Sequence, residues 1–308
     1  MLPLILAPMA ELSHRALREL VESFGGCDLY YSEMISAGGI IGGGQFEKYY
    51  LDSEPKPEKL VYQIAGGKPE QLEKAAAILD KNECAGIDIN MGCCAPAILK
   101  SGAGAAWMNN TEAAAAMTAL VRKAVRHHRL SVKLRIGQTD NFDYLLNFCK
   151  RLENEGVEQI TLHPRTTKEK FKSYARWEYV SMLKKELTIP VAGNGDILTI
   201  EELRSKAVNT DCDAVMSGRL AIKQPWCFAA AKNIFSEQKI DLQSTAFLFL
   251  ELLAKYQPPE FHYSRARRFF HYFCGNFFWA EYLRNAINRE KTLSGMEKIL
   301  KEYFRNMV

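Results

Sequence analysis

The chain has 308 residues, a formal net charge of +4 and 47% hydrophobic residues. This length suits one large domain, alone or with a small second one, and the composition excludes a disordered, collagen-like or coiled-coil protein. No stretch approaches the roughly 18–20 uncharged apolar residues that a membrane span needs, so we expect no membrane partner. The apolar N-terminus has no basic segment ahead of it, which favours a first core strand over a signal peptide.

The eight cysteines and six histidines show no spacing typical of a zinc site. Without a secretory signal, we expect a cytoplasmic protein with free thiols in a reducing environment. We therefore expect no metal centre, and most of the cysteines are expected to be small core residues.

Short β-type runs alternate with amphipathic helical patterns between residues 1 and 235. Several of the β-type runs are almost wholly apolar, as strands buried on both faces are. Helices are predicted to start near Asn110 and Thr199, while residues 38–58 are predicted to be a long loop. The expected strands are residues 3–8, 29–35, 59–65, 86–91, 131–136, 159–163, 189–193 and 213–218.

Eight strands with intervening helices match a (β/α)8 TIM barrel in count and length. A doubly wound open sheet is the competing fold, but its GxGxxG fingerprint is absent after the first strand. Beyond residue 238 the alternation stops, and the pattern predicts three or four helices broken at Pro258-Pro259 and near Gly275. We expect a catalytic barrel over residues 1–238 and a small all-α domain over residues 239–308.

Polar or reactive side chains stand at nearly every expected strand end, which is where a barrel carries its function. Their local sequences, in chain order, are APMA, SEM, Gln63, DINMGC, KSGAGAAWM, VKLRIG, LHPRT, YARW, VAGNGDI and DAVMSGRLA. Together, from residue 4 to about 230, these motifs resemble the tRNA-dihydrouridine synthase family. The resemblance implies a barrel that binds FMN and uses NADPH to reduce the C5–C6 double bond of selected uridines in tRNA.

Glycine-rich turns after the seventh and eighth strands expose backbone N–H groups ahead of a helix, which is how barrels hold phosphate. The alternative is that these glycines only form turns. The residues predicted to hold the FMN phosphate are Gly193, Asn194, Gly195, Asp196, Gly218 and Arg219.

Lys133 lies within a buried strand, where a lysine needs a partner, and could stabilise negative charge on the reduced flavin ring. A lysine reaching solvent at a strand end is the alternative. Gln63 has the hydrogen-bonding groups for the flavin pyrimidine edge, and Pro8 and Met9 are expected to contact the ring. The resemblance implies a flavin contact for His163, for which a core histidine is the alternative.

Cys93 is the predicted catalytic residue. Reduction of uracil needs hydride at C6 and a proton at C5, and a carbon atom needs a positioned acid. A thiol on the loop after the fourth strand fits this role, whereas a buried structural cysteine is the alternative. Cys94 stands where the family usually has proline, so a second thiol lies nearby. Asn90 could hold the uracil or the flavin.

Contacts with tRNA are expected from both parts of the chain. Residues 261–308 carry nine Lys or Arg and four Glu, a net charge of +5, which favours phosphate binding, although a solvated helical face is the alternative. Glu33 is predicted to face the substrate or to pair with a base such as Arg165. The other predicted tRNA contacts are Arg165, Arg176, Arg267, Arg268 and Arg284.

We predict a monomeric oxidoreductase acting on a D-loop uridine. Two other functions stay open. A free-pyrimidine oxidoreductase similar to dihydroorotate dehydrogenases would share the barrel, the FMN and a catalytic cysteine or serine. A non-catalytic RNA-binding barrel would bind no FMN.

Overall fold

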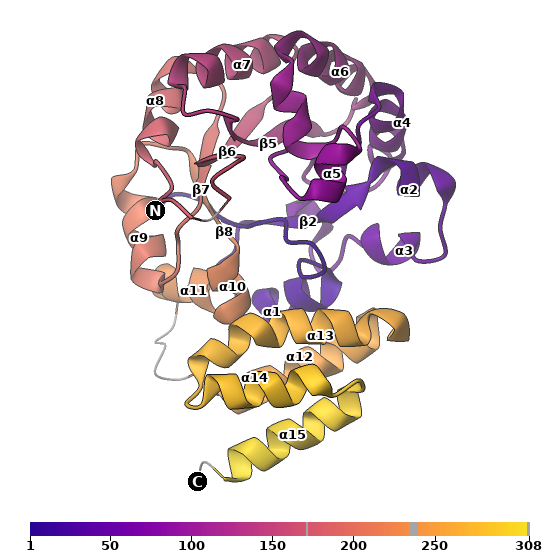
Figure 1. The fold of residues 1–308 in the computed structure, drawn as a ribbon, viewed down its shortest axis with the longest axis vertical. Coiled ribbons are helices and arrows are strands. Elements are labelled where there is room, and N and C mark those ends of the chain that lie inside the picture. The colour runs from indigo at the N-terminus through magenta and orange to yellow at the C-terminus, as the bar shows by residue number, and fades with distance from the viewer. Residues whose placement is uncertain (171, 235–239, 307–308) are drawn as a thin grey trace.

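Eight parallel strands form a closed barrel in chain order, with β1 paired to β8 (Figure 1). The computed structural model describes residues 1–170, 172–234 and 240–306. The TIM barrel predicted from the alternating pattern is confirmed. The strands are β1 Leu4–Leu6, β2 Leu29–Ser36, β3 Leu60–Ala65, β4 Gly86–Met91, β5 Arg129–Gly137, β6 Gln159–Thr166, β7 Val191–Asn194 and β8 Ala214–Ser217.

Helices surround this barrel because each connection presents one apolar face to the sheet. The Asn110 side chain accepts a hydrogen bond from Ala113 N, and Thr199 forms a reciprocal capping box with Glu202, so both predicted helix starts are confirmed. The helices of the barrel are α1 Arg15–Phe24, α4 Pro69–Leu79, α5 Pro96–Lys100, η2 Gly104–Asn109, α6 Thr111–Ala124, α7 Phe142–Asn154, α8 Glu178–Glu186, α9 Ile200–Asn209, α10 Arg219–Lys223 and α11 Cys227–Ala231.

The segment 38–58 differs from the prediction of a long loop. It contains most of α2 Ala37–Gly42, all of α3 Glu47–Tyr50 and the start of η1 Pro57–Lys59. Ser36 caps α2 by accepting from Gly39 N, and the rings of Phe46 and Tyr50 lie 4.8 and 6.1 Å from the ring of Phe261. These tertiary contacts stabilise short helices that a glycine-rich sequence disfavours on its own.

Apolar side chains fill the part of the barrel interior that lies below the carboxyl ends of the strands, so the barrel is not a pore. This interior cluster joins residues of five strands and the turn after β1, namely Ile5, Ala7, Tyr31, Val61, Ala192, Ala214 and Met216. Ala7 and Met216 of this cluster face a cavity towards the carboxyl ends of the strands, which is where a barrel binds its ligand.

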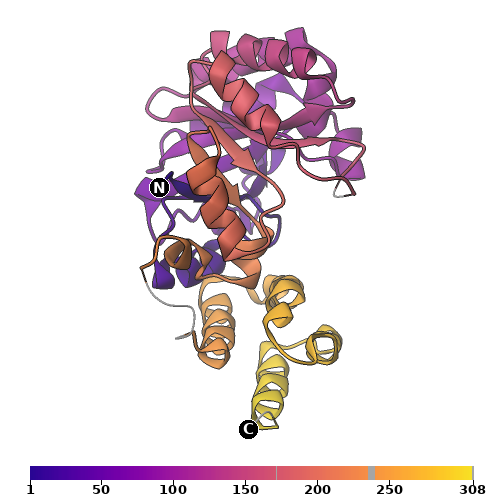
Figure 2. The ribbon, with the colours of Figure 1, turned by 90° about the vertical axis from the view of Figure 1, so that its left-hand side faces the viewer.

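In the described residues 240–306 the tail forms four α-helices bundled at one side of the barrel, with α15 farther from the barrel than α13 (Figure 1 and Figure 2). Helix α12 packs against α1 and α13 packs against α10, so the tail shares a hydrophobic core with the barrel. The predicted domain boundary between residues 238 and 239 lies outside the described residues. No helix in the described part of the chain is long and apolar enough to cross a membrane. The tail elements are α12 Leu242–Tyr256, α13 Pro259–Phe273, η4 Cys274–Asn276, α14 Ala280–Arg289 and α15 Leu293–Arg305.

Candidate active site

A cavity of about 480 Å³ opens at the carboxyl ends of the strands. Every strand, or the turn that follows it, contributes to the wall, and the last turn of α13 adds His271 and Tyr272. The barrel and the tail therefore build one cavity together. Its polar or charged lining residues include Gln63, Asn90, Cys93, Lys133, Arg135, His163, Asn194, Asp196, Ser217 and Arg219.

Most of the residues predicted to bind FMN lie at this cavity. Ten of the eleven line it, together with Cys93 and Asn90, and the exception is Gly193. A Cβ at Gly193 would stand 2.2 Å from Cζ3 of Trp177, so this glycine makes room for the indole ring. A cofactor contact for Gly193 stays a prediction.

Backbone contacts hold the Cys93 loop at the cavity. Cys93 N donates to Asn90 Oδ1 at 2.9 Å, and Cys93 O accepts from Ala105 N at 2.9 Å. A Cβ at Gly104 would stand 2.5 Å from Cys93 O, so only glycine permits this close approach. Cys93 lines the cavity and Cys94 does not, which favours Cys93 as the reactive thiol.

Lys133 lies beside Asn90 on the neighbouring strand, at the same level of the barrel. Burial and then the charge of Arg135 lower the pKa of Lys133 to about 8. No hydrogen bond or ion pair joins its ammonium group to any other residue that the structure describes. A cation with three donor hydrogens therefore faces the cavity and can serve an electron-rich ligand.

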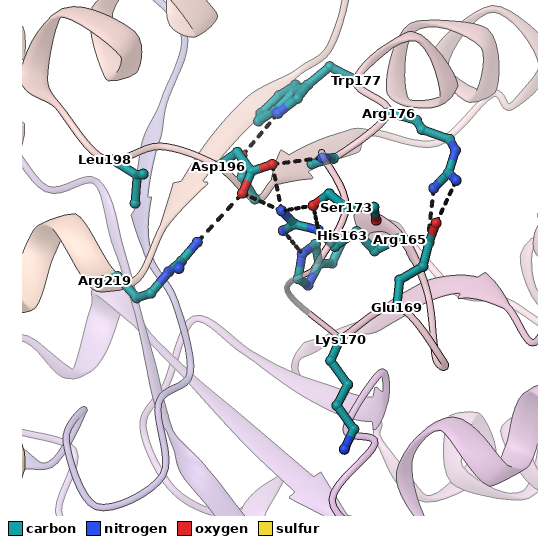
Figure 3. A network of polar contacts seen from close by, with 12 residues as sticks. His163, Arg165, Glu169, Lys170, Ser173, Arg176, Trp177, Asp196, Leu198 and Arg219 are labelled. Carbon is teal, nitrogen blue, oxygen red and sulfur yellow. Dashed lines mark hydrogen bonds and ion pairs between the residues drawn. The ribbon is translucent and has the colours of Figure 1, made fainter.

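Figure 3 shows the network around Asp196, which lies two residues after the end of β7. Arg165 is 3% exposed, and its Nη2 donates to both oxygens of Asp196 at 2.6 Å. Arg165 Nη1 also lies 3.1 Å from Nε2 of His163. Because arginine only donates, this nitrogen accepts and the histidine proton lies on Nδ1. Burial, with Lys133 as the next cause, lowers the pKa of His163, so its ring is neutral.

Arg219 reaches the same carboxylate from the other side, with Nη2 3.5 Å from Asp196 Oδ1. The shorter bonds to Asp196 come from Arg165 and from Ala175 N at 2.7 Å, so Arg165 supplies most of the charge compensation. Arg219 follows Gly218, where a Cβ would approach Met9 Sδ to 3.0 Å. This corner of the cavity combines an arginine with tightly packed glycine backbone, which suits a phosphate group.

Glu33 and Arg165 do not pair with each other. Glu33 is 4% exposed and forms an ion pair with Arg265 of α13 at 2.9 Å, whereas Arg165 holds Asp196. Neither Glu33 nor Arg165 lines the cavity. Both side chains therefore have partners within the protein. Their contacts with tRNA stay predictions.

The other predicted tRNA contacts lie in three places. Arg176 pairs with Glu169 and Asp140. Arg267 and Arg268 line a second cavity of about 410 Å³, which shares four of its residues with the first. Arg284 lines neither cavity.

Several residues of the site have no role that the sequence alone predicts. Asp88 is fully buried beneath the cavity, and its position two residues before Asn90 in an apolar strand is the available signal. Arg135 donates from Nε to Gly92 O at 3.0 Å and from Nη1 to Thr166 O at 3.2 Å, which joins two strand ends. The contributions of Arg265, His271 and Tyr272 depend on how the tail docks, for which the sequence holds no local signal.

No group of three or more His, Cys, Asp or Glu side chains that could hold a metal ion occurs in residues 1–170, 172–234 and 240–306. The polar groups at the cavity are mostly amides, a lysine and arginines, and its single thiol, its carboxylate and its two histidines form no cluster of three. This set suits an organic ligand with a phosphate group.

A sequence model described as Dihydrouridine synthase (Dus) matches residues 5–306. The chain belongs to this family. It is 30% identical over 231 residues to the "Probable tRNA-dihydrouridine synthase" of Aquifex aeolicus (strain VF5), covering 74% of this chain and 72% of that protein. It is 27% identical over an alignment of 311 residues to "tRNA-dihydrouridine synthase B" of Xanthomonas axonopodis pv. citri (strain 306), covering 99% of this chain and 93% of that protein. The family predicted from the strand-end motifs is confirmed.

A solved structure supports the fold alone. The chain of a 2-naphthoyl-CoA reductase in complex with 2-naphthoyl-CoA matches with a TM-score of 0.58 at 11% identity. The match covers 83% of this chain and 56% of that chain. Family membership and fold therefore agree with the position of the cavity at the carboxyl ends of the strands.

Proposed function

We propose that the protein is a tRNA-dihydrouridine synthase that binds FMN and uses NADPH to reduce the C5–C6 double bond of a D-loop uridine in tRNA. The observation that carries this proposal is that Cys93 and Lys133 line one cavity in a chain of the dihydrouridine synthase family. The names of the relatives support tRNA as the substrate. We place the enzyme in the cytoplasm.

The residues at the cavity fit FMN. Lys133, Gln63 and His163 offer a cation and polar groups to the flavin ring, while Gly195, Gly218 and Arg219 offer a phosphate site. A volume of about 480 Å³ lies within the usual range of roughly 300–1,000 Å³ for ligand pockets. When bound, FMN would supply the hydride chemistry of this reduction, with NADPH as the reductant.

Cys93 acts as the general acid. Its S–H bond breaks and the proton goes to C5 of the uracil, which leaves a thiolate. The positive charge of Lys133 lies close enough to interact with that thiolate, and a proton from solvent restores the thiol. Asn90 orients the Cys93 backbone through its amide oxygen.

The second cavity is the path of the tRNA. It shares Met9, Ala10, His271 and Tyr272 with the first, so the two form one groove from the barrel mouth along α13. Arg267 and Arg268 border this groove and would hold phosphates, while the target base leaves its stack to enter the barrel. One chain supplies all of these residues, so a monomer is sufficient.

The deciding experiment is mass spectrometry of tRNA incubated with the purified protein, FMN and NADPH. We expect dihydrouridine at one D-loop position, and the same position should carry unmodified uridine in cells that lack the protein. Activity on free uracil or orotate with none on tRNA would favour the dihydroorotate-type reaction instead. A colourless protein that binds tRNA and takes up no FMN would favour a non-catalytic RNA-binding barrel.

A further inference from the structure

Asp88 lies directly beneath the cavity and has no exposed surface. Its Oδ1 accepts from Ser131 Oγ at 2.6 Å, and its Oδ2 accepts from Gln63 Nε2 at 2.8 Å. Burial raises the pKa of Asp88 to about 6, so the group is a carboxylate at neutral pH. A buried carboxylate is costly unless its partners are fixed, so its retention here calls for a role beyond packing.

The hydrogen bonds continue from Asp88 to the backbone of Cys93. Gln63 Oε1 accepts from Asn90 Nδ2 at 2.8 Å. Asn90 Oδ1 in turn accepts from the backbone N–H groups of Gly92 at 3.1 Å and Cys93 at 2.9 Å. Two side-chain amides therefore connect the buried carboxylate to the backbone of Cys93.

The direction of this chain of bonds is fixed at both ends, because the backbone N–H groups of Gly92 and Cys93 only donate and the Asp88 carboxylate only accepts. Each amide has one donor end and one acceptor end. A carboxylate only accepts, so it turns the NH2 group of Gln63 towards itself and the oxygen towards Asn90. Asn90 must then present its NH2 group to Gln63, and its oxygen is left for the N–H of Cys93.

We propose that Asp88 is a positioning residue that orients the amides of Gln63 and Asn90 and thereby holds Cys93 at the cavity. The consequence for proton transfer to uracil rests on the function proposed above. The effect on the Cys93 loop does not, because it concerns only the bonds within the chain. The competing role is that Asp88 serves only as a counter-charge for Lys133.

Exchanging the residue types at positions 88 and 90 separates the positioning role of Asp88 from the counter-charge role. Asp88→Asn can keep its amide oxygen on Gln63 Nε2 and turn its NH2 group towards Ser131 Oγ, so it removes the charge and leaves the amides of Gln63 and Asn90 in place. Asn90→Asp introduces a second acceptor that opposes the oxygen of Gln63. In the double variant Asp88→Asn/Asn90→Asp, Gln63 can reverse and donate to the new carboxylate, which also accepts from Cys93 N.

The measurement is the rate at which iodoacetamide alkylates Cys93, followed by mass spectrometry of the purified protein. All variants carry Cys94→Ala, and fragment ions assign the modification to Cys93 or to Cys84, which lies on the same tryptic peptide. We expect Asn90→Asp to react roughly fivefold faster or more, the scale of one unsatisfied buried group, and Asp88→Asn to stay within about twofold of the parent. The double variant should return to within about twofold of the parent, as coupled neighbours do. Asp80→Asn, a second buried carboxylate that accepts from the backbone of residues 126–128, is the control and should leave the rate unchanged.

An unchanged rate in Asn90→Asp overturns the proposal. A double variant as reactive as Asn90→Asp also overturns it, and a fast rate in Asp88→Asn overturns it in favour of the counter-charge role. If a single variant yields no folded protein, recovery of folded protein in the double variant supports the proposal, and failure to recover it counts against it. Parent protein that forms no dihydrouridine in tRNA overturns the proposed function without affecting this test.

Discussion

Glu33 of β2 and Arg265 of α13 form a buried ion pair across 232 positions of sequence, with 2.9 Å between Oε2 and Nη2. The other oxygen of Glu33 accepts from Glu11 N at 2.7 Å. Burial raises the pKa of Glu33, and the charge of Arg265 opposes this shift. The pair joins α13 to the barrel mouth, and the last turn of this helix adds His271 and Tyr272 to the cavity.

Arg265→Met should lower the free energy of unfolding by about 3–5 kcal/mol, because it leaves the Glu33 carboxylate buried without its cation. Urea denaturation followed by circular dichroism measures the change. Glu33→Gln/Arg265→Met should cost less than the single variant, since no buried charge remains. Lys301→Ala removes a surface pair with Glu297 and should cost at most about 1 kcal/mol. An Arg265→Met variant as stable as Lys301→Ala would show that the pair does not hold α13 in place.

Cys93→Ala should separate the two half-reactions. Reduction of the flavin by NADPH needs no proton at C5, so its rate should stay nearly unchanged. Reoxidation by tRNA should slow by roughly 10²–10⁴, the usual scale for a lost general acid. Rapid-mixing absorbance at the flavin band follows both steps.

Cys94→Ala is the matched control, because the neighbouring thiol does not line the cavity. It should cost far less in the tRNA step. A slow Cys94→Ala variant beside a normal Cys93→Ala variant would transfer the acid role to Cys94. Normal rates in both would assign the proton to another group or to water.

Arg219→Ala and Gly218→Val should both weaken FMN retention, the first by removing a cation and the second by placing a bulky side chain against Met9. The flavin-to-protein absorbance ratio after gel filtration measures retention. Gly42→Ala is the control, since a Cβ there meets no atom within 4 Å. Full FMN occupancy in both variants would show that the phosphate group binds elsewhere than at the end of β8.

The barrel could be predicted because strand runs, helix caps and breaks are local signals. The same holds for Cys93 and Lys133, because the end of a strand identifies the face of the barrel to which a side chain belongs. Helices α2 and α3 could not be predicted, since Phe261 of the distant α13 packs against the second of them.

The roles of arginines depended on partners that the sequence does not indicate. Arg165 holds Asp196 in place of the expected Glu33, and Glu33 instead holds Arg265 from the tail. Gly193 is predicted to lie in a phosphate-binding turn, but it lies within β7, and its missing side chain accommodates Trp177. Motif spacing indicates where a residue lies, whereas the long-range packing decides what it contacts.

FMN binding to the apoprotein should weaken as pH rises through about 8. Burial and Arg135 lower the pKa of Lys133 to about 8, so the ammonium form that favours an electron-rich ring edge is present below this pH and lost above it. Fluorescence quenching of FMN titrated with apoprotein from pH 6 to about 9.5 measures the affinity. Lys133→Arg should remove this dependence, because arginine stays protonated. The same decline in Lys133→Arg would assign it to another group.

Charge reversal at the groove should weaken tRNA binding and reduce its dependence on salt. Arg267→Glu/Arg268→Glu removes two cations that border the second cavity, so the slope of log Kd against log salt should fall by about one for each phosphate that the protein no longer neutralises. Filter binding at several salt concentrations measures the slope. Lys301→Glu changes a tail charge that lines neither cavity, so it is the control and should leave the slope nearly unchanged. Point variants suit this test better than truncation of the tail, because α12 and α13 share a core with α1 and α10 and their removal would expose it. Equal slopes in the groove variant and the parent would exclude Arg267 and Arg268 from the tRNA surface. If Lys301→Glu lowers the slope as much as the groove variant does, the charge of the whole tail, and not the groove, attracts the RNA.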